Sequence, residues 1–123
     1  MRFDGKHGLL SSVVGALGIL MVVGCGPSLA PSKAVSALTP EEAQGREVYG
    51  ELCASCHYAT HTGDLHGPSL FGLFRKVYMP SGAPANDVRV TAVILHGHGM
   101  MPGYEGQLDA QHLQELVAYL HTL

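Results

Sequence analysis

Two cysteines and a histidine lie together near the middle of the chain, in the order Cys53-Ala-Ser-Cys56-His57. Two thiols three residues apart on one helical turn can add to the two vinyl groups of a haem, and the histidine that follows then faces the iron as a nitrogen ligand. The motif therefore predicts one haem c, attached covalently through two thioethers at Cys53 and Cys56, with His57 as an iron ligand.

Three other uses of these cysteines are weaker. A structural zinc site needs four ligands, and the sequence after His57 contains no further cysteine. A thioredoxin-like redox pair needs a βαβ setting, which the sequence does not show. A disulfide between Cys53 and Cys56 would be strained on a helix. Haem attachment is therefore the favoured chemistry.

Two helices are expected to position the motif, one before it and one at the end of the chain. Thr39 and Glu42 can form a capping box around Pro40, which suits the first helical position. Apolar residues then continue at helical spacing to about Leu52. Asp109 can cap the second helix, whose apolar stripe consists of Leu113, Leu116, Val117 and Leu120. Helices this short are marginal alone, so the two need each other or a third surface.

The segment between these helices is mostly loop, rich in glycine and proline. One exception is the β-branched stretch over residues 87–95. Propensity favours a strand there, whereas periodicity allows a helix that buries Val90, Val93 and Ile94. A domain with so little regular structure cannot build an ordinary core, so we expect the haem to fill its interior.

The start of the chain has the pattern of an export signal. Basic residues precede an apolar run, 9–23, which as a helix would be about 22 Å long and so shorter than the ~30 Å core of a bilayer. The run ends Val-Val-Gly-Cys25, which resembles a bacterial lipobox. We therefore expect residues 1–24 to be a lipoprotein signal peptide and Cys25 to carry the lipid. Cleavage near Ala30 and an uncleaved anchor are the alternatives, and all three place the rest of the chain outside the cytoplasm.

Length and composition limit the function of the chain beyond the signal. We expect residues 25–38 to be the lipidated cysteine and a flexible tether, and residues 39–123 to be one domain. The 123-residue chain is too short for a two-domain enzyme, and its net charge of −3 gives no basic surface for nucleic acid. No carboxylate pair, Ser-His-Asp set or phosphate-binding loop stands out. An enzyme with a small-molecule substrate is therefore not expected.

Residues 39–123 resemble the class I c-type cytochromes. Gly45 and Tyr49 precede the first haem cysteine by eight and four positions, like the glycine and aromatic residue of the N-terminal helix in that family. Leu116 and Tyr119 match the partner positions on the family's last helix. The resemblance implies an all-α cytochrome c fold in which the N- and C-terminal helices cross and loops wrap one covalent haem. It also favours a helix for the β-branched stretch.

The same resemblance implies further site residues. The family's segment after the haem motif is matched by GPSLFGLF, in which the proline carbonyl accepts a hydrogen bond from the histidine ligand. By that match Pro68 orients His57, and Leu70 lines the haem pocket. Arg75 is placed against a haem propionate. Met101 directly precedes a proline in a segment similar to the family's ligand loop, and it is the expected sixth iron ligand.

Several other residues remain open as partners of the haem. Met100 and Met79 are the alternative methionine ligands, and His96 and His98 lie beside the ligand loop. Tyr78 and Tyr104 could each hydrogen-bond a propionate or close the pocket. The remaining histidines of the domain are expected at the surface: His61, His66, His112 and His121.

A haem held by histidine and methionine in this family implies an electron-transfer protein. A neutral thioether favours Fe(II) and completes a six-coordinate iron, which suits a carrier of single electrons. The implied partners are redox proteins of a respiratory chain, with Cys25 tethering the domain to the extracytoplasmic side of a bacterial membrane. The domain lacks the lysine ring of some relatives, so an apolar contact or a basic partner is expected. The alternatives are an electron-entry subunit of a larger dehydrogenase or oxidase, and a haem sensor or peroxidase-like protein with a labile sixth ligand.

Overall fold

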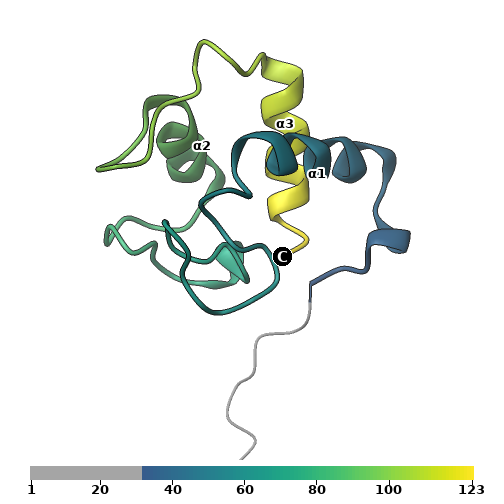
Figure 1. Ribbon diagram of the computed structural model, residues 1–123, viewed down its shortest axis with the longest axis horizontal. Helices are drawn as coiled ribbons and strands as arrows, with labels where there is room; N and C mark the ends of the chain where they lie inside the picture. The colour runs from purple at the N-terminus through teal and green to yellow at the C-terminus, as the bar shows by residue number, and fades with distance from the viewer. Residues whose placement is uncertain (1–31) are drawn as a thin grey trace, which may run out of the picture.

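Three α-helices and two short 3₁₀ helices make up the regular structure of residues 32–123, the part of the chain that this computed structural model describes (Figure 1). In chain order these elements are η1 (Val35–Ala37), α1 (Pro40–Leu52), η2 (Leu73–Arg75), α2 (Asp87–His96) and α3 (Ala110–Leu120). Within these residues, β structure is limited to two isolated bridges, Tyr78 with Pro84 and His98 with Met101. The all-α fold class is therefore confirmed.

Helix α1 begins and ends where the sequence predicts. The Thr39 hydroxyl accepts a hydrogen bond from the Glu42 N–H at 3.2 Å, and the Glu42 carboxylate accepts one from the Thr39 N–H at 2.7 Å. Pro40 opens the first turn, where its missing N–H would have had no partner in the helix. The helix ends at Leu52, so the first haem cysteine lies at its C-cap.

Helix α1 crosses α3 at close range because Gly45 has no side chain. A Cβ at Gly45 would overlap the backbone oxygen of Glu115 and lie 2.9 Å from the Cβ of Tyr119. Beside this contact, the rings of Tyr49 and Tyr119 pack with their centroids 5.5 Å apart. Leu116 of α3 has no exposed surface. The predicted crossing of the N- and C-terminal helices is confirmed.

The β-branched stretch forms α2, so the strand that propensity favours does not form. The Asn86 side chain caps this helix by accepting a hydrogen bond from the Arg89 N–H at 3.0 Å. Val90 and Ile94 are buried on one face of the helix. The cap and the buried face override the β propensity of the sequence. The helix ends at His96, and the φ of its C-cap residue, Gly97, is 78°, in the left-handed region.

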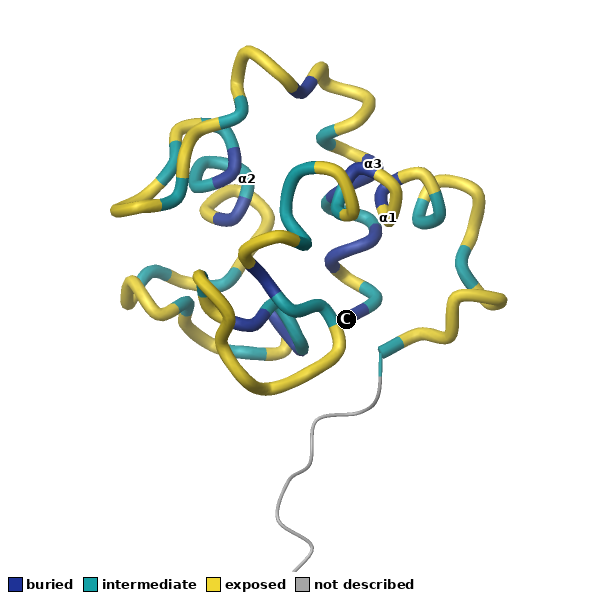
Figure 2. The backbone as a smooth tube through the Cα atoms, viewed as in Figure 1, coloured by how far each residue is buried: buried dark blue, intermediate teal, exposed yellow. Residues whose placement is uncertain are grey.

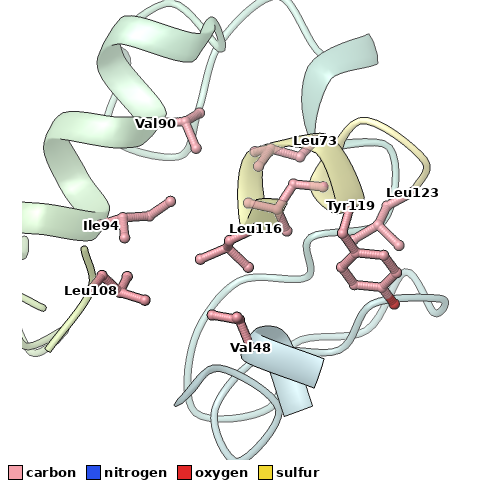
Figure 3. Close-up of a cluster of buried hydrophobic side chains, with 9 residues drawn as sticks. Val48, Leu73, Val90, Ile94, Leu108, Leu116, Tyr119 and Leu123 are labelled. Atoms are coloured by element: carbon pink, nitrogen blue, oxygen red, sulfur yellow. The ribbon is translucent and has the colours of Figure 1, made fainter. Parts of the chain in front are cut away.

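Buried apolar side chains from all three helices meet in one cluster. Figure 3 shows Val90 and Ile94 pointing from α2 toward the side of the cluster that holds Leu116. The cluster consists of Val48, Leu73, Val90, Ile94, Leu108, Leu116, Tyr119, Leu120 and Leu123. Figure 2 shows that most loop residues between the helices are exposed. Among residues 32–123, Leu116 is the one large side chain that is fully buried. The protein side chains alone therefore make a thin core.

The residues that precede α1 lie against the domain. The Lys33 backbone N–H donates to the Thr122 carbonyl at 2.8 Å, and the Lys33 ammonium pairs with the Glu42 carboxylate at 2.6 Å. Of the tether expected over residues 25–38, the part from Ser32 onward is thus attached to the domain.

The remaining N-terminal predictions fall outside the described residues. They are the signal peptide over residues 1–24, the lipid at Cys25 and the first part of the tether, and they stay predictions. In the described part of the chain, no helix is both long enough and apolar enough to cross a bilayer.

Candidate haem-binding site

The haem-attachment motif forms the turn that directly follows α1. The backbone N–H groups of Cys56 and His57 both donate to the Cys53 carbonyl, at 3.0 and 2.9 Å, so the two thiols lie on one turn and are not joined in a disulfide. Cys53 packs against the apolar cluster, whereas Cys56 is exposed. Burial, followed by the nearby Cys56, raises the pKa of the Cys53 thiol to about 11. Burial therefore disfavours the charged thiolate at Cys53.

His57 is buried, and a backbone carbonyl orients its ring. The Nδ1 atom lies 2.7 Å from the carbonyl oxygen of Pro68. Because a carbonyl can only accept a hydrogen bond, Nδ1 must carry the proton, which leaves the Nε2 lone pair available to a metal. The structure thus contains the contact that the resemblance implies for Pro68, and this contact selects the tautomer that an iron ligand needs.

Gly67 and Tyr49 hold His57 from two further directions. A Cβ at Gly67 would overlap Cε1 of His57 and lie 2.9 Å from both ring nitrogens. The Tyr49 hydroxyl donates to the backbone carbonyl of His57 at 2.5 Å. Neither contact was expected from the sequence. For the Gly67 contact the sequence does contain a recognisable signal, which is a glycine directly before the proline that orients the histidine.

The expected ligand loop folds back onto the C-terminal end of α2. His98 and Met101 exchange backbone hydrogen bonds of 3.1 and 3.0 Å across a tight turn. A Cβ at Gly97 would lie 2.5 Å from the Met101 oxygen, and a Cβ at Gly103 would lie 2.5 Å from the Leu95 oxygen. The loop backbone is therefore held by close packing as well as by hydrogen bonds.

The methionines differ in exposure. Met101 is half-buried and packs against the apolar cluster, whereas Met100 is 96% exposed in the same turn. Met79, the other alternative, is also half-buried against the cluster. His96 and His98 are exposed. Within the ligand loop, Met101 is thus the methionine that contacts the interior.

Leu70 and Arg75 lie on the segment that follows Pro68. Leu70 is half-buried against the cluster, and its N–H donates to the Tyr58 carbonyl at 2.9 Å. Arg75 is exposed at the end of η2, with its guanidinium carbon 5.4 Å from the centroid of the Phe71 ring. Leu70 thus contacts the interior, as a residue that lines a pocket must. The propionate contact expected for Arg75 stays a prediction.

Tyr104 and His121 make contacts that were not expected from the sequence. The Tyr104 hydroxyl donates to the carbonyl of Leu52, the last residue of α1, at 3.0 Å. The His121 ring stacks on Phe74 with centroids 3.8 Å apart, and its Nε2 lies 2.8 Å from the Asp87 carboxylate. The side chains expected at the surface are exposed: His61, His66, His112 and His121. Sequence carries no local signal for either contact, because the partners lie far apart along the chain.

The donor set and the interior fit a covalent haem. Two cysteines lie on one turn, the Nδ1 of the adjacent histidine is hydrogen-bonded to the Pro68 carbonyl so that its Nε2 can face a metal, and a thioether from a distant loop reaches the same apolar cluster. Throughout residues 32–123, no group of three or more His, Cys, Asp or Glu side chains could hold a bare metal ion. A haem supplies four nitrogen ligands of its own, so the protein needs to provide only the axial ones.

Known proteins share this pattern. A family model described as cytochrome c oxidase, cbb3-type, subunit III matches residues 40–120. Cytochrome c6 of Synechocystis sp. is 24% identical over 85 residues, which cover 69% of this chain and 68% of that protein. Cytochrome c6 of Euglena viridis is 28% identical over 78 residues, which cover 63% of this chain and 87% of that protein. Because the family model spans all three α-helices and both expected axial ligands, the chain belongs to that family and is a class I c-type cytochrome, an electron-transfer protein with one covalent haem c.

Proposed function

We propose that this domain carries single electrons with His57 and Met101 as the two axial ligands of the haem iron. The observation that carries the proposal is the contrast within the ligand loop, where Met101 packs into the apolar cluster and Met100 is almost fully exposed. The haem iron supplies the redox chemistry by alternating between Fe(II) and Fe(III). A soft, neutral thioether favours Fe(II), and two protein ligands leave no axial position for a substrate.

The contribution of the protein is to hold both ligands still. On the histidine side, the Pro68 carbonyl fixes the ring nitrogen and Tyr49 fixes the backbone of the same residue. On the methionine side, the backbone bonds between His98 and Met101 close the turn. Ligands that move little between oxidation states suit an electron carrier, because less rearrangement accompanies each transfer.

Electrons are proposed to pass at the edge of the haem nearest Cys56. Cys53 is turned into the apolar cluster and Cys56 is exposed, so the edge attached to Cys56 should lie at the surface. Both lysines of residues 32–123 have partners, since Lys33 pairs with Glu42 and Lys76 donates to a backbone carbonyl at 3.2 Å. These pairings support docking to a redox protein through an apolar surface or through basic groups on the partner.

The experiment that tests the carrier function compares the two methionines of the loop. The oxidised protein should show the weak far-red absorption band of sulfur-ligated iron. Met101→Ala should remove this band and lower the reduction potential by on the order of 0.1 V, within the span of about 0.8 V that axial ligands set. Met100→Ala should leave both unchanged, because that side chain is exposed.

Other outcomes of this experiment would contradict the carrier function or its ligand. Loss of the band in Met79→Ala or Met100→Ala, but not in Met101→Ala, would reassign the sixth ligand. Rapid CO binding by the reduced parent at neutral pH would favour the sensor or peroxidase-like alternative, since it requires an open or labile axial position.

We propose in addition that a lipid on Cys25 tethers the domain to the extracytoplasmic side of a bacterial membrane, near respiratory partners. The support is the lipobox-like sequence after the apolar run. Lys33 is bonded to the domain, so the tether would extend only from Cys25 to Ser32. These seven residue steps span at most about 25 Å. Cys25→Ser should release the protein from membranes with its haem spectrum intact. A variant that stays in the membrane fraction would contradict the lipid anchor and favour an uncleaved apolar anchor.

A second candidate function is that of a haem subunit in a larger complex. The matching family model is described as a subunit of an oxidase, which favours this alternative over a freely diffusing carrier. Purification in mild detergent tests it: a stoichiometric partner that stays bound through size-exclusion chromatography would support the subunit, and a monomeric haem protein would support the carrier.

A further inference from the structure

The part of the chain that carries Met101 is joined to the rest of the domain at few points. Residues 86–106, which we call the α2–loop unit, comprise α2, its cap and the ligand loop. Helix α2 makes little direct contact with α3. Two side-chain hydrogen bonds join opposite ends of the unit to the other helices, and they link Asp87 with His121 and Tyr104 with Leu52.

Within the unit, Tyr104 is fixed to α2. Its backbone N–H donates to the Ile94 carbonyl at 3.0 Å, and the N–H of Glu105 donates to the Leu95 carbonyl at 3.1 Å. Gly103 is packed so closely that a Cβ there would lie 2.5 Å from the Leu95 oxygen. The unit around Tyr104 therefore moves as one piece, and the ligand loop moves with it.

The Tyr104 hydroxyl connects this unit to the C-terminal end of α1. The bond to the Leu52 carbonyl joins residues 52 positions apart in the chain. The last carbonyls of a helix have no partner within that helix, so this bond satisfies an acceptor that α1 leaves open. Leu52 directly precedes Cys53, and the half-buried Tyr104 ring packs against the same apolar cluster as both residues.

We propose that Tyr104 is a positioning residue that sets the distance between the ligand loop and the haem-attachment turn and thereby keeps Met101 on the iron. This inference rests on the proposed function, because it takes Met101 as the sixth ligand. The thioether at Cys53 places the haem relative to the end of α1, and the Tyr104 hydroxyl places the ligand loop relative to the same helix end. Loss of that hydroxyl frees the α2–loop unit to move away from the haem as a body, so the methionine dissociates more often.

Gln114 provides the comparison at the other end of α1. Its side-chain amide donates a hydrogen bond of 2.8 Å to the carboxylate of Glu41, in the first turn of the helix. An alanine at this position removes one side-chain hydrogen bond to α1 without touching either expected haem ligand. It leaves the contact between the α2–loop unit and Leu52 in place.

Imidazole binding to the oxidised full-length haem protein measures dissociation of the methionine, because imidazole must replace the sixth ligand. We expect Tyr104→Phe to bind imidazole about fivefold more tightly than the parent, which corresponds to about 1 kcal/mol at 1.4 kcal/mol per factor of ten. The rate of CO binding to the reduced protein should rise by the same factor. Gln114→Ala should leave both quantities at the parent value. Phenylalanine keeps the aromatic ring of Tyr104 and Gln114 is exposed, so both variants should fold and retain haem.

Two results would overturn the proposal. One is an imidazole affinity of Tyr104→Phe equal to that of the parent, and the other is an equal rise in Gln114→Ala, which would indicate general loosening. The far-red band of the parent separates this proposal from the proposed function. A parent without the band overturns both the methionine ligand and the positioning role, whereas a parent with the band and an unchanged affinity in Tyr104→Phe overturns the positioning role alone.

Discussion

Two regions of the domain are held together in different ways. At the α1–α3 crossing, backbone meets backbone at Gly45, and Leu116 is fully buried (Figures 1 and 3). The α2–loop unit instead meets the rest of the domain through apolar side chains of α2 and of the ligand loop and through two side-chain hydrogen bonds. His57 follows directly from the first region, and Met101 lies in the second. The two proposed axial ligands therefore depend on different kinds of support.

This difference indicates which ligand is released first. Regions with few buried contacts open locally at a lower free energy than that of global unfolding. The α2–loop unit is such a region, so the methionine side should open while the α1–α3 crossing stays folded. Because Met101 of this unit is a proposed haem ligand, a bound haem would supply further contact that stabilises α2.

The largest effect is expected at the helix crossing. In Gly45→Ala the new methyl group would overlap the Glu115 backbone oxygen, and the helices would have to separate. We expect a loss of about 3 kcal/mol in the free energy of unfolding, at the upper end of overpacking effects, because the clash is with backbone rather than with a flexible side chain. Denaturant unfolding followed by far-UV circular dichroism measures it.

Gly50 is the control for this prediction. It lies in the same helix, but a Cβ there would meet no atom within 4 Å. Gly50→Ala should therefore stabilise the protein by about 0.5–1 kcal/mol through the better helix propensity of alanine. Similar effects of Gly45→Ala and Gly50→Ala would show that the crossing is looser than the structure indicates.

The two helices of the crossing were predictable because each has a local signal. The capping box at Thr39 and Glu42 and the cap at Asp109 lie within a few residues of the helix starts that they control. The close approach at Gly45 was implied instead by the resemblance to the c-type cytochromes. The contact of His57 with Pro68 followed from a resemblance to a known family. Helix α2 was ambiguous, since its β-branched residues favour a strand and only burial of Val90 and Ile94 in the folded domain decides for a helix.

A smaller and more local effect is expected in the α2–loop unit. In Gly103→Ala the new Cβ would lie 2.5 Å from the Leu95 oxygen and 2.9 Å from the His96 carbonyl carbon, so the ligand loop must move off α2. Imidazole should bind the oxidised protein about tenfold more tightly, or about 1.4 kcal/mol. The denaturant midpoint should fall less than in Gly45→Ala. Gly106→Ala is the control, since a Cβ there meets no atom within 4 Å, and an equal change in both variants would refute the packing argument.

The contacts that hold the α2–loop unit were not predictable from the sequence. Tyr104 and Leu52 lie 52 positions apart, and His121 and Asp87 lie 34 apart. A hydrogen bond of this kind depends on how two distant segments are placed in the folded domain. No periodicity or capping pattern in the sequence carries that information. The same holds for the bond between Lys33 and Thr122, which attaches residues that their composition alone assigns to a tether.

The smallest expected effect is the loss of stability in acid. It should arise from the caps of the helices that cross and not from the cap of α2. The pKa of Glu42 lies below its usual value because its carboxylate accepts hydrogen bonds from Lys33 and from the Thr39 backbone, and the pKa of Asp109 is lowered chiefly by the backbone N–H of His112. Helix α2 is capped instead by Asn86, which does not titrate.

A carboxyl whose pKa is lower in the folded state adds stability above its unfolded pKa, and that stability is lost as the pH falls through its folded pKa. The free energy of unfolding should therefore fall below about pH 4.5, the ordinary value for the Glu42 carboxyl. In Glu42→Gln, the difference in denaturant midpoint between pH 7 and acid should shrink. Glu51→Gln, an exposed change in the last turn of the same helix, should keep the parent's difference. Equal acid sensitivity in the parent and in Glu42→Gln would mean that the α1 capping box does not contribute to it.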